Sequence, residues 1–407
     1  MPNGNGWQGE VLRDLAGGAP QGAHRPGEQA YGSFAQGSGL PAQSSPAQDG
    51  PYGGDVPPRE GVSYQEQQAG YPSDWPQHAG RQNQPTPAVA VSPQQSQPHR
   101  VPGSQPVVDD RLVGVVRRKP QHGESFAARA VRAVRGALSS SAAREVAAAT
   151  QVAGVLQQPV TTGRQIAVTS IRGGAGKSTV TALLGTTFAH YRQDPVLFLE
   201  TDPALGSLPL RLGAQTLRWT TSDVAEIAKP DMSLLDVTGY LVQLPNNAWL
   251  LPASLGQIGA MLDSGAYERA VVALRRYFGV MVIDCETLPA EVSRVALAAA
   301  HGRVLTTPAT PEGITSTYSV LQWMQKLPRH VIAGTVVVLT ELVPQQGVDL
   351  NGAAQQLKST GASVQVLPYD RHLAAGGPIR TEFLAAPTRQ AAARIAADVF
   401  QLSQKRY

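Results

Sequence analysis

The sequence has a single cysteine, Cys285, among its 407 residues, which excludes an internal disulfide framework and a cysteine-rich metal site. No run approaches the ~18 continuous apolar residues of a spanning helix, so an integral membrane protein is excluded. The first ten residues, MPNGNGWQGE, lack the basic and then apolar pattern of a secretion signal. These absences predict a cytoplasmic protein and leave peripheral attachment to a membrane or to the nucleoid open.

Charged residues are scarce, at 16% of the chain against roughly 25% in an average domain. Sixteen prolines and 16 glutamines lie before residue 110, and the net charge of residues 1–110 is −5. Residues 1–108 lack the apolar surface to form a core, so we predict a disordered Pro/Gln/Gly-rich tail. Single aromatic residues in this tail suit contacts with an unidentified protein partner, whereas a solvated tail without specific contacts is the commoner case for such a composition.

Residues 109–164 are predicted to form a basic linker, because residues 111–164 carry a net charge of +7. Within it, the sequence FAARAVRAVRGAL at 126–138 has the period of an amphipathic helix. Alanine, valine and leucine lie on one face of this helix, and Arg129, Arg132 and Arg135 lie on another. Packing on the protein's own core, a plain linker helix, and contact with nonspecific DNA or an anionic membrane all remain open.

From residue 165 to residue 407, short β-branched runs alternate with helical stretches. Strands are predicted at 166–170, 196–200, 249–252, 280–284, 303–307, 335–339 and 363–367. Helices are predicted at 177–191, 267–277, 291–300, 313–326, 352–359 and 388–404. Apolar strands separated by helices favour a sheet that is buried on both faces. We therefore predict an α/β domain with a doubly wound, mostly parallel sheet.

The segment IAVTSIRGGAGKSTVTALLG combines a strand, a glycine-rich loop and a helix. Glycines allow backbone N–H groups to turn toward an anion, and the positive end of the helix dipole faces the same point. Lys177 would reach the β- and γ-phosphates of a nucleotide, and the Ser178 hydroxyl would ligate Mg²⁺. The strict motif has glycine at the position of Ile171. The predicted phosphate-binding residues are Gly173, Gly174, Ala175, Gly176, Lys177, Ser178 and Thr179.

This loop resembles that of the MinD/ParA class of deviant Walker A ATPases, and the resemblance extends over residues 165–407. The stretches VLFLETDPALGSL, VMVIDCETLP, VLTTPATPEGITS and LPYDRHLAAGGPI resemble later motifs of the class. The resemblance implies a P-loop NTPase fold, ATP and Mg²⁺ as cofactors, slow ATP hydrolysis and an ATP-dependent homodimer.

The same resemblance implies roles for individual residues. Asp202 would position the attacking water and contact the Mg²⁺ shell, and Asp284 would hold a Mg²⁺-bound water. The catalytic residues would be Lys177, Asp202 and Arg172, and the metal residues Ser178, Asp202 and Asp284. The residues near the adenine would be Pro368, Tyr369 and Asp370.

Four positions depart from the pattern of this class. Arg172 replaces the lysine that reaches across the dimer, and the planar arginine fork is not equivalent to an ammonium at a phosphate. Glu200 stands where an aspartate is usual, Glu286 where proline is common, and Thr340 where an asparagine often contacts the base. The sequence therefore predicts nucleotide binding with slow turnover.

A long polar tail, a basic linker and then an ATPase domain resemble the layout of EspI-like ATPases, which are encoded with actinobacterial type VII secretion systems. The predicted function is an ATP-switched ATPase that regulates or positions a cellular machine such as type VII secretion. A ParA-like DNA-partitioning ATPase and a nucleotide-binding scaffold with little turnover are the alternatives. The partition alternative requires that residues 111–164 supply the DNA contacts.

Overall fold

The computed structural model describes residues 103, 105–108, 121–131, 142–204, 206–344 and 347–405. Most of the tail predicted at 1–108 and much of the linker predicted at 109–164 lie outside these residues. The amphipathic helix predicted at 126–138 is helical over 126–131, and the rest of it lies outside the described part. Phe126 and Val131 in this turn are 85% and 56% exposed, so the described side chains do not pack on the core.

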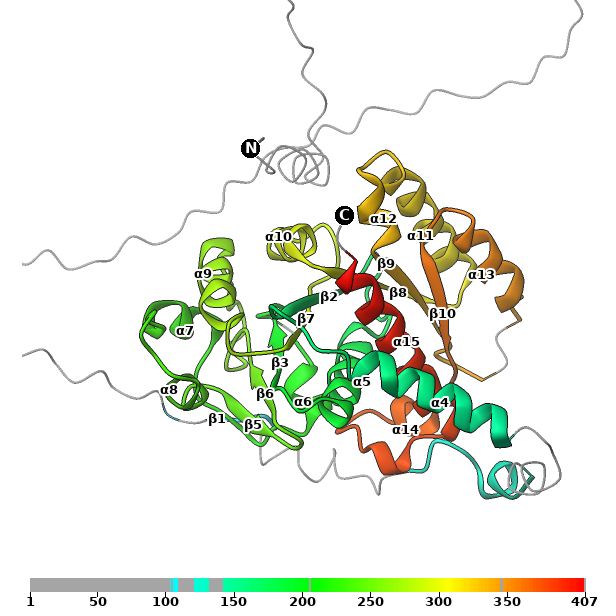
Figure 1. The fold of residues 1–407 in the computed structure, drawn as a ribbon, viewed down its shortest axis with the longest axis horizontal. Coiled ribbons are helices and arrows are strands. Elements are labelled where there is room, and N and C mark those ends of the chain that lie inside the picture. Colours follow the sequence, from blue (N-terminus) through cyan, green and yellow to red (C-terminus); the bar gives the residue numbers. More distant parts are fainter. Residues whose placement is uncertain are drawn as a thin grey trace, which may run out of the picture. The chain divides into compact units, whose positions relative to one another are not determined.

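An eight-stranded sheet forms the centre of the described domain (Figure 1), in the order β10-β9-β8-β2-β7-β3-β6-β5. Its strands are β2 (Arg164–Ser170), β3 (Val196–Glu200), β5 (Val242–Leu244), β6 (Ala248–Leu251), β7 (Val280–Asp284), β8 (Gly302–Pro308), β9 (Thr335–Thr340) and β10 (Ser363–Leu367). Every neighbouring pair is parallel except β5 with β6. The mostly parallel sheet predicted from the apolar runs is therefore confirmed.

The short edge strand β5 is the described strand of this sheet that the apolar pattern does not predict. Gln243 is exposed between the half-buried Val242 and Leu244, so no continuous apolar run marks the strand. Asn246 and Asn247 in the turn to β6 have φ values of 58° and 54°. Tight hairpin turns require this left-handed region, which asparagine tolerates better than most residues.

Helices cover both faces of the sheet, as a doubly wound fold requires. On one face, Ile166 and Val168 pack in a core with α4 (Ala142–Leu156), α5 (Lys177–Tyr191) and α15 (Ala386–Gln404). On the other face, Ala167 packs toward α7 (Thr221–Ile227), α9 (Ser264–Leu274) and α10 (Glu291–Ala299). Further described α-helices are α6 (Leu208–Leu212), α8 (Leu234–Thr238), α11 (Pro311–Met324), α12 (Arg329–Ala333), α13 (Leu350–Lys358) and α14 (Arg371–Ala374). None of the described helices is long and apolar enough to cross a membrane.

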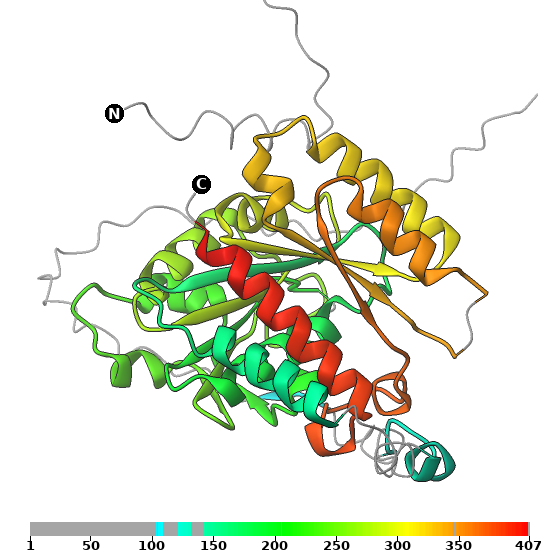
Figure 2. The same ribbon diagram turned by 45° about the vertical axis from the view of Figure 1, so that its right-hand side comes forward.

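Residues before β2 also contribute to the folded domain. α4 lies beside α15 (Figure 2), and Leu156 at its C-terminal end is fully buried. β1 (Gln105–Pro106) pairs with β4 (Thr216–Leu217). A methyl group at Gly123 would lie 2.3 Å from Asp370 Oδ2 and 2.6 Å from the Ala385 nitrogen, so this close approach requires glycine. Part of the segment predicted as a linker thus packs on the α/β domain, because its apolar side chains complete the core.

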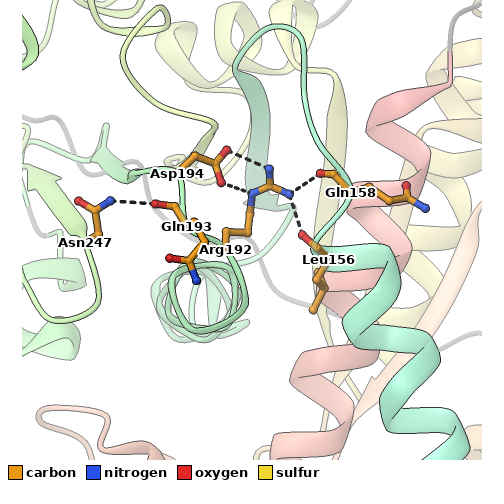
Figure 3. A network of polar contacts seen from close by, with 6 residues as sticks. All are labelled: Leu156, Gln158, Arg192, Gln193, Asp194 and Asn247. Carbon is orange, nitrogen blue, oxygen red and sulfur yellow. Dashed lines mark hydrogen bonds and ion pairs between the residues drawn. The ribbon is translucent and has the colours of Figure 1, made fainter.

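The Arg192 guanidinium joins the end of α4 to the connection between α5 and β3 (Figure 3). Its Nε and Nη2 donate to the two carboxylate oxygens of Asp194 at 2.8 and 2.9 Å. Its Nη1 donates to the carbonyls of Leu156 and Gln158 at 2.7 and 3.0 Å. The guanidinium also lies 4.7 Å from the centre of the Phe400 ring. The Arg192 side chain is 4% exposed, so these partners replace the water that would otherwise solvate its charge.

We expect Arg192→Met to lower the free energy of unfolding by about 2–4 kcal/mol, because Asp194 and two carbonyls lose their donor. Arg218→Met, at an exposed arginine, is the matched control and is expected to change stability by less than about 0.5 kcal/mol. Urea unfolding of the parent and the two variants measures both values. Equal stability of all three would show that α4 is not anchored through Arg192.

Candidate functional site

The glycine-rich loop connects the end of β2 to the start of α5, as the sequence predicts. Gly174 and Gly176 have φ values of 74° and 84°, in the left-handed region that favours glycine. A Cβ at Gly173 or Gly174 would meet nothing within 4 Å, so the outer side of the loop is open. Gly176 is the N-cap of α5 and has no side chain to occupy the helix N-terminus. The loop therefore leaves the first N–H groups of α5 free to bind an anion.

Two hydroxyl groups, those of Ser170 and Thr340, bond to backbone carbonyls of the glycine-rich loop. Ser170 Oγ donates to the Arg172 carbonyl at 2.8 Å. Thr340 Oγ1 lies 3.1 Å from both the Ala175 carbonyl and the Thr307 carbonyl, to which its one hydrogen is shared. Thr340 is 3% exposed at the end of β9, so its hydroxyl faces the loop and not solvent. The departure from asparagine at this position thus has a local structural role.

The predicted phosphate and metal residues meet where β2 and β7 end. Lys177 Nζ donates to Thr287 Oγ1 at 2.9 Å. Thr181 Oγ1 donates to Asp284 Oδ1 at 3.1 Å, and the Ser178 hydroxyl is close enough to Asp284 to oppose the rise in its pKa. The first turn of α5 therefore presents an ammonium and a hydroxyl beside a buried carboxylate, which is the ligand set that a magnesium nucleotide requires.

Burial raises the pKa of Asp284 from 3.8 to about 6. The hydroxyl of Ser178, the charge of Lys177 and the hydroxyl of Thr181 oppose the shift, and the charge of Asp202 adds to it. Asp202 follows β3 by two residues and is half-buried. Because the charges of Asp202 and Lys177 both act on Asp284, the two residues lie in the same electrostatic neighbourhood. The catalytic and metal roles of Asp202 stay predictions.

Two further acidic residues surround this point. Burial, and then the charge of Asp284, raise the pKa of Glu200 from 4.5 to about 8. Burial and the charge of Asp202 raise the pKa of Glu286, while Lys177 lowers it. Burial also raises the pKa of the neighbouring Cys285 thiol, which keeps it protonated and unsuited to act as a nucleophile. Negative charge is therefore unfavourable at this point, and a bound cation would relieve it.

Arg172 lies apart from these groups, on the exposed side of the loop. Its Nε donates to Ser316 Oγ on α11 at 3.1 Å. This contact belongs to its own chain, and the reach of Arg172 to a second subunit stays a prediction.

The carboxylate of Asp370 is occupied by its own chain. Oδ1 accepts from the backbone nitrogens of His372 and Leu373 at 2.8 and 3.3 Å, and Oδ2 accepts from that of Ala385 at 2.8 Å. Asp370 is 2% exposed and is the N-cap of α14. Its neighbours Pro368 and Tyr369 are half-buried. Contact of these three residues with an adenine stays a prediction. Backbone N–H groups of the same chain already use most of the acceptor sites of the Asp370 carboxylate.

Two site residues were not identified from the sequence. Thr181 lies one turn after Lys177 on α5, and residues at this spacing share one face of a helix. The spacing therefore indicates that Thr181 and Lys177 face the sheet together. Thr287 follows β7 in an irregular segment, and only tertiary packing brings its hydroxyl to the Lys177 amine.

Parallel strands with helices on both faces and a glycine loop between β2 and α5 define a P-loop NTPase fold. No family model matches the chain. Over 228 residues it is 29% identical to the ESX-1 secretion-associated protein EspI of Mycobacterium tuberculosis, covering 54% of this chain and 34% of EspI. Over 151 residues it is 34% identical to the septum site-determining protein MinD of Synechocystis sp., covering 37% of this chain and 54% of that protein.

The chain is also similar to solved structures. A ParA family ATPase from Chlorobium tepidum has a TM-score of 0.48 at 13% identity, covering 58% of this chain and 98% of its own. MinD from Pyrococcus horikoshii, complexed with Mg-ADP, has a TM-score of 0.41 at 19% identity, covering 57% and 94%. The homologues of the chain are MinD/ParA-family ATPases and EspI, so the predicted resemblance is confirmed; the match spans about a third of EspI's length.

We expect Asp284→Asn to stabilise the protein in the absence of nucleotide, because asparagine keeps an acceptor for Thr181 and has no charge to desolvate. The raised pKa means that the folded chain binds this proton more tightly than the unfolded chain does. The parent therefore loses stability as the pH rises from about 4 to about 6, and the loss is complete above that. The gain in the variant should reach up to about 3 kcal/mol near pH 8.

Urea unfolding at about pH 5 and about pH 8 measures this difference. Glu226→Gln, at an exposed glutamate on α7, is the control for removal of one negative charge. A lower stability of Asp284→Asn than of the parent near pH 8 would contradict the argument.

Proposed function

We propose that the chain is a switch ATPase that binds ATP with Mg²⁺ at residues 172–179 and hydrolyses it slowly. One observation carries the proposal: the Lys177 amine and the Ser178 hydroxyl stand at the N-terminus of α5 beside the buried carboxylate of Asp284. This arrangement combines donors for phosphate oxygens with oxygen ligands for a hard divalent cation. Homologues of the MinD/ParA family are ATPases, which supports the same activity at the level of the family.

Each group has a part that follows from its position. The backbone N–H groups of the loop and the Lys177 amine would bind the phosphates, and the Ser178 hydroxyl would be the protein's direct ligand to Mg²⁺. Asp284 and Asp202 would act on that ion through bound water, and Asp202 would also orient the attacking water. When bound, the ion would neutralise phosphate charge. The described residues hold no cluster of three or more His, Cys, Asp or Glu side chains for a metal, so the nucleotide itself would complete the coordination.

For the cellular role, we propose regulation of a secretion machine of type VII. The similarity to EspI, an ESX-1 secretion-associated protein, supports this proposal. The order of tail, basic segment and ATPase-like domain supports it as well. A protein partner for residues 1–108, and DNA or membrane contact through residues 111–164, remain parts of the same proposal.

Two substitutions separate binding from hydrolysis. Lys177→Ala should weaken ATP binding by about a hundredfold, because charged contacts to the phosphates are lost. Asp202→Ala should bind ATP like the parent and hydrolyse it at least about tenfold more slowly. Calorimetric titration and single-turnover assays on the full chain measure both constants, with Lys358→Ala at an exposed lysine as the control. Parent-like ATP affinity in Lys177→Ala would exclude the phosphate cradle.

A third substitution tests the switch. If Arg172 reaches the phosphates of a second subunit, Arg172→Ala should weaken the ATP-dependent dimer by about ten- to a hundredfold and leave ATP binding by the monomer intact. Arg172→Lys should retain the dimer, because a positive charge remains. Sedimentation of the parent and both variants with ATP and Mg²⁺ measures the association. A monomer in all three samples would contradict the switch mechanism.

A further inference from the structure

Glu200 is a buried acid whose carboxylate joins two separate loops. It ends β3 and is 2% exposed. Its Oε1 accepts a hydrogen bond from the backbone nitrogen of Leu208 at 3.2 Å, where α6 begins after the loop that carries Asp202. Its Oε2 accepts from the backbone nitrogen of Ala253 at 3.4 Å, in the connection between β6 and α9. One side chain thus links the Asp202 loop to the Ala253 connection.

The loop after β3 lies directly against this carboxylate. A methyl group at Gly206 would be 2.2 Å from Glu200 Oε1 and 2.6 Å from the Asp202 carbonyl, so only glycine permits the approach. A second bond joins the same two segments, because Ser254 Oγ donates to the Pro203 carbonyl at 2.6 Å. The loop that holds Asp202 is therefore attached to the Ala253 connection at two points.

Stability does not explain a glutamate at this position. β3 and β7 pair in register, so that Glu200 lies opposite Asp284. Ionising both acids at a buried strand end would add mutual repulsion to the desolvation penalty of each. A residue that lowers stability while linking a loop to the sheet edge is typical of a functional position.

We propose that Glu200 is a positioning residue: its carboxylate holds the loop after β3 against the Ala253 connection and so sets Asp202 relative to the phosphate cradle. Glu200 acts through Asp202 and touches no nucleotide. This inference rests on the proposed ATP hydrolysis. The experiment below distinguishes a failure of the positioning role from a failure of the proposed ATPase activity.

Glu200→Gln tests the proposal with little change in size. The amide places an NH₂ group where one oxygen accepted a backbone hydrogen, so one of the two links is lost. We expect the rate constant of ATP hydrolysis to fall by about tenfold, with an ATP dissociation constant within about twofold of the parent and no loss of melting temperature. Hydrogen exchange at the amides of Leu208 and Ala253 should become faster. Ser254→Ala, which removes the other link, should change hydrolysis in the same direction.

A double-mutant cycle with Asp202→Ala shows whether Glu200 works through Asp202. In the Asp202→Ala background, Glu200→Gln should cause no further loss of rate. Glu226→Gln is the matched control and should equal the parent in every assay.

Three results would overturn the proposal. The first is an unchanged hydrolysis rate in Glu200→Gln, and the second is a further loss of rate when Glu200→Gln is added to Asp202→Ala. The third is unchanged amide exchange at Leu208 and Ala253. A parent that fails to bind or hydrolyse ATP contradicts the proposed function instead. The exchange measurement then still decides whether Glu200 holds the loop.

Discussion

The parallel pairing of β2 with β7 is the contact on which the site depends. It sets Asp284 opposite Val168, just before the glycine loop leaves the sheet. β7 pairs in turn with β3, which sets Asp284 opposite Glu200. Because parallel strands end at the same edge, these pairings bring the acids of two strands to the N-terminus of α5, where open α/β sheets bind their ligands. The loop has glycines for close approach, but the sheet determines which carboxylates face it.

The same arrangement opposes stability. Asp284 and Glu200 are each 2% exposed, and burial raises the pKa of both. The nearby cation, Lys177, and the hydroxyls of Ser178 and Thr181 offset part of this penalty at Asp284. A fold selected for stability alone would replace such acids with apolar residues. Their presence agrees with a site at which a bound cation would balance the charge of the buried acids.

Rigidity around the loop comes from side chains outside it. Glycines at positive φ leave the loop with few constraints of its own. The hydroxyls of Ser170 and Thr340 compensate by bonding to the carbonyls of Arg172 and Ala175. Farther away, Arg192 joins α4 to the core and shows that the domain begins before β2. The site is thus held by bonds between segments that are distant in sequence.

The sequence by itself determined the local elements. The strands predicted at 196–200, 280–284 and 363–367 and the helix predicted at 177–191 have the observed bounds. Continuous apolar runs and a glycine loop before a helix are local patterns, which the chain carries wherever it folds. Only the tertiary structure decided the strand order, the burial of Glu200 between two loops and the contact of Lys177 with Thr287. It also turned the Asp370 carboxylate to backbone N–H groups of its own chain. These features depend on packing between segments far apart in sequence, for which a local pattern holds no information.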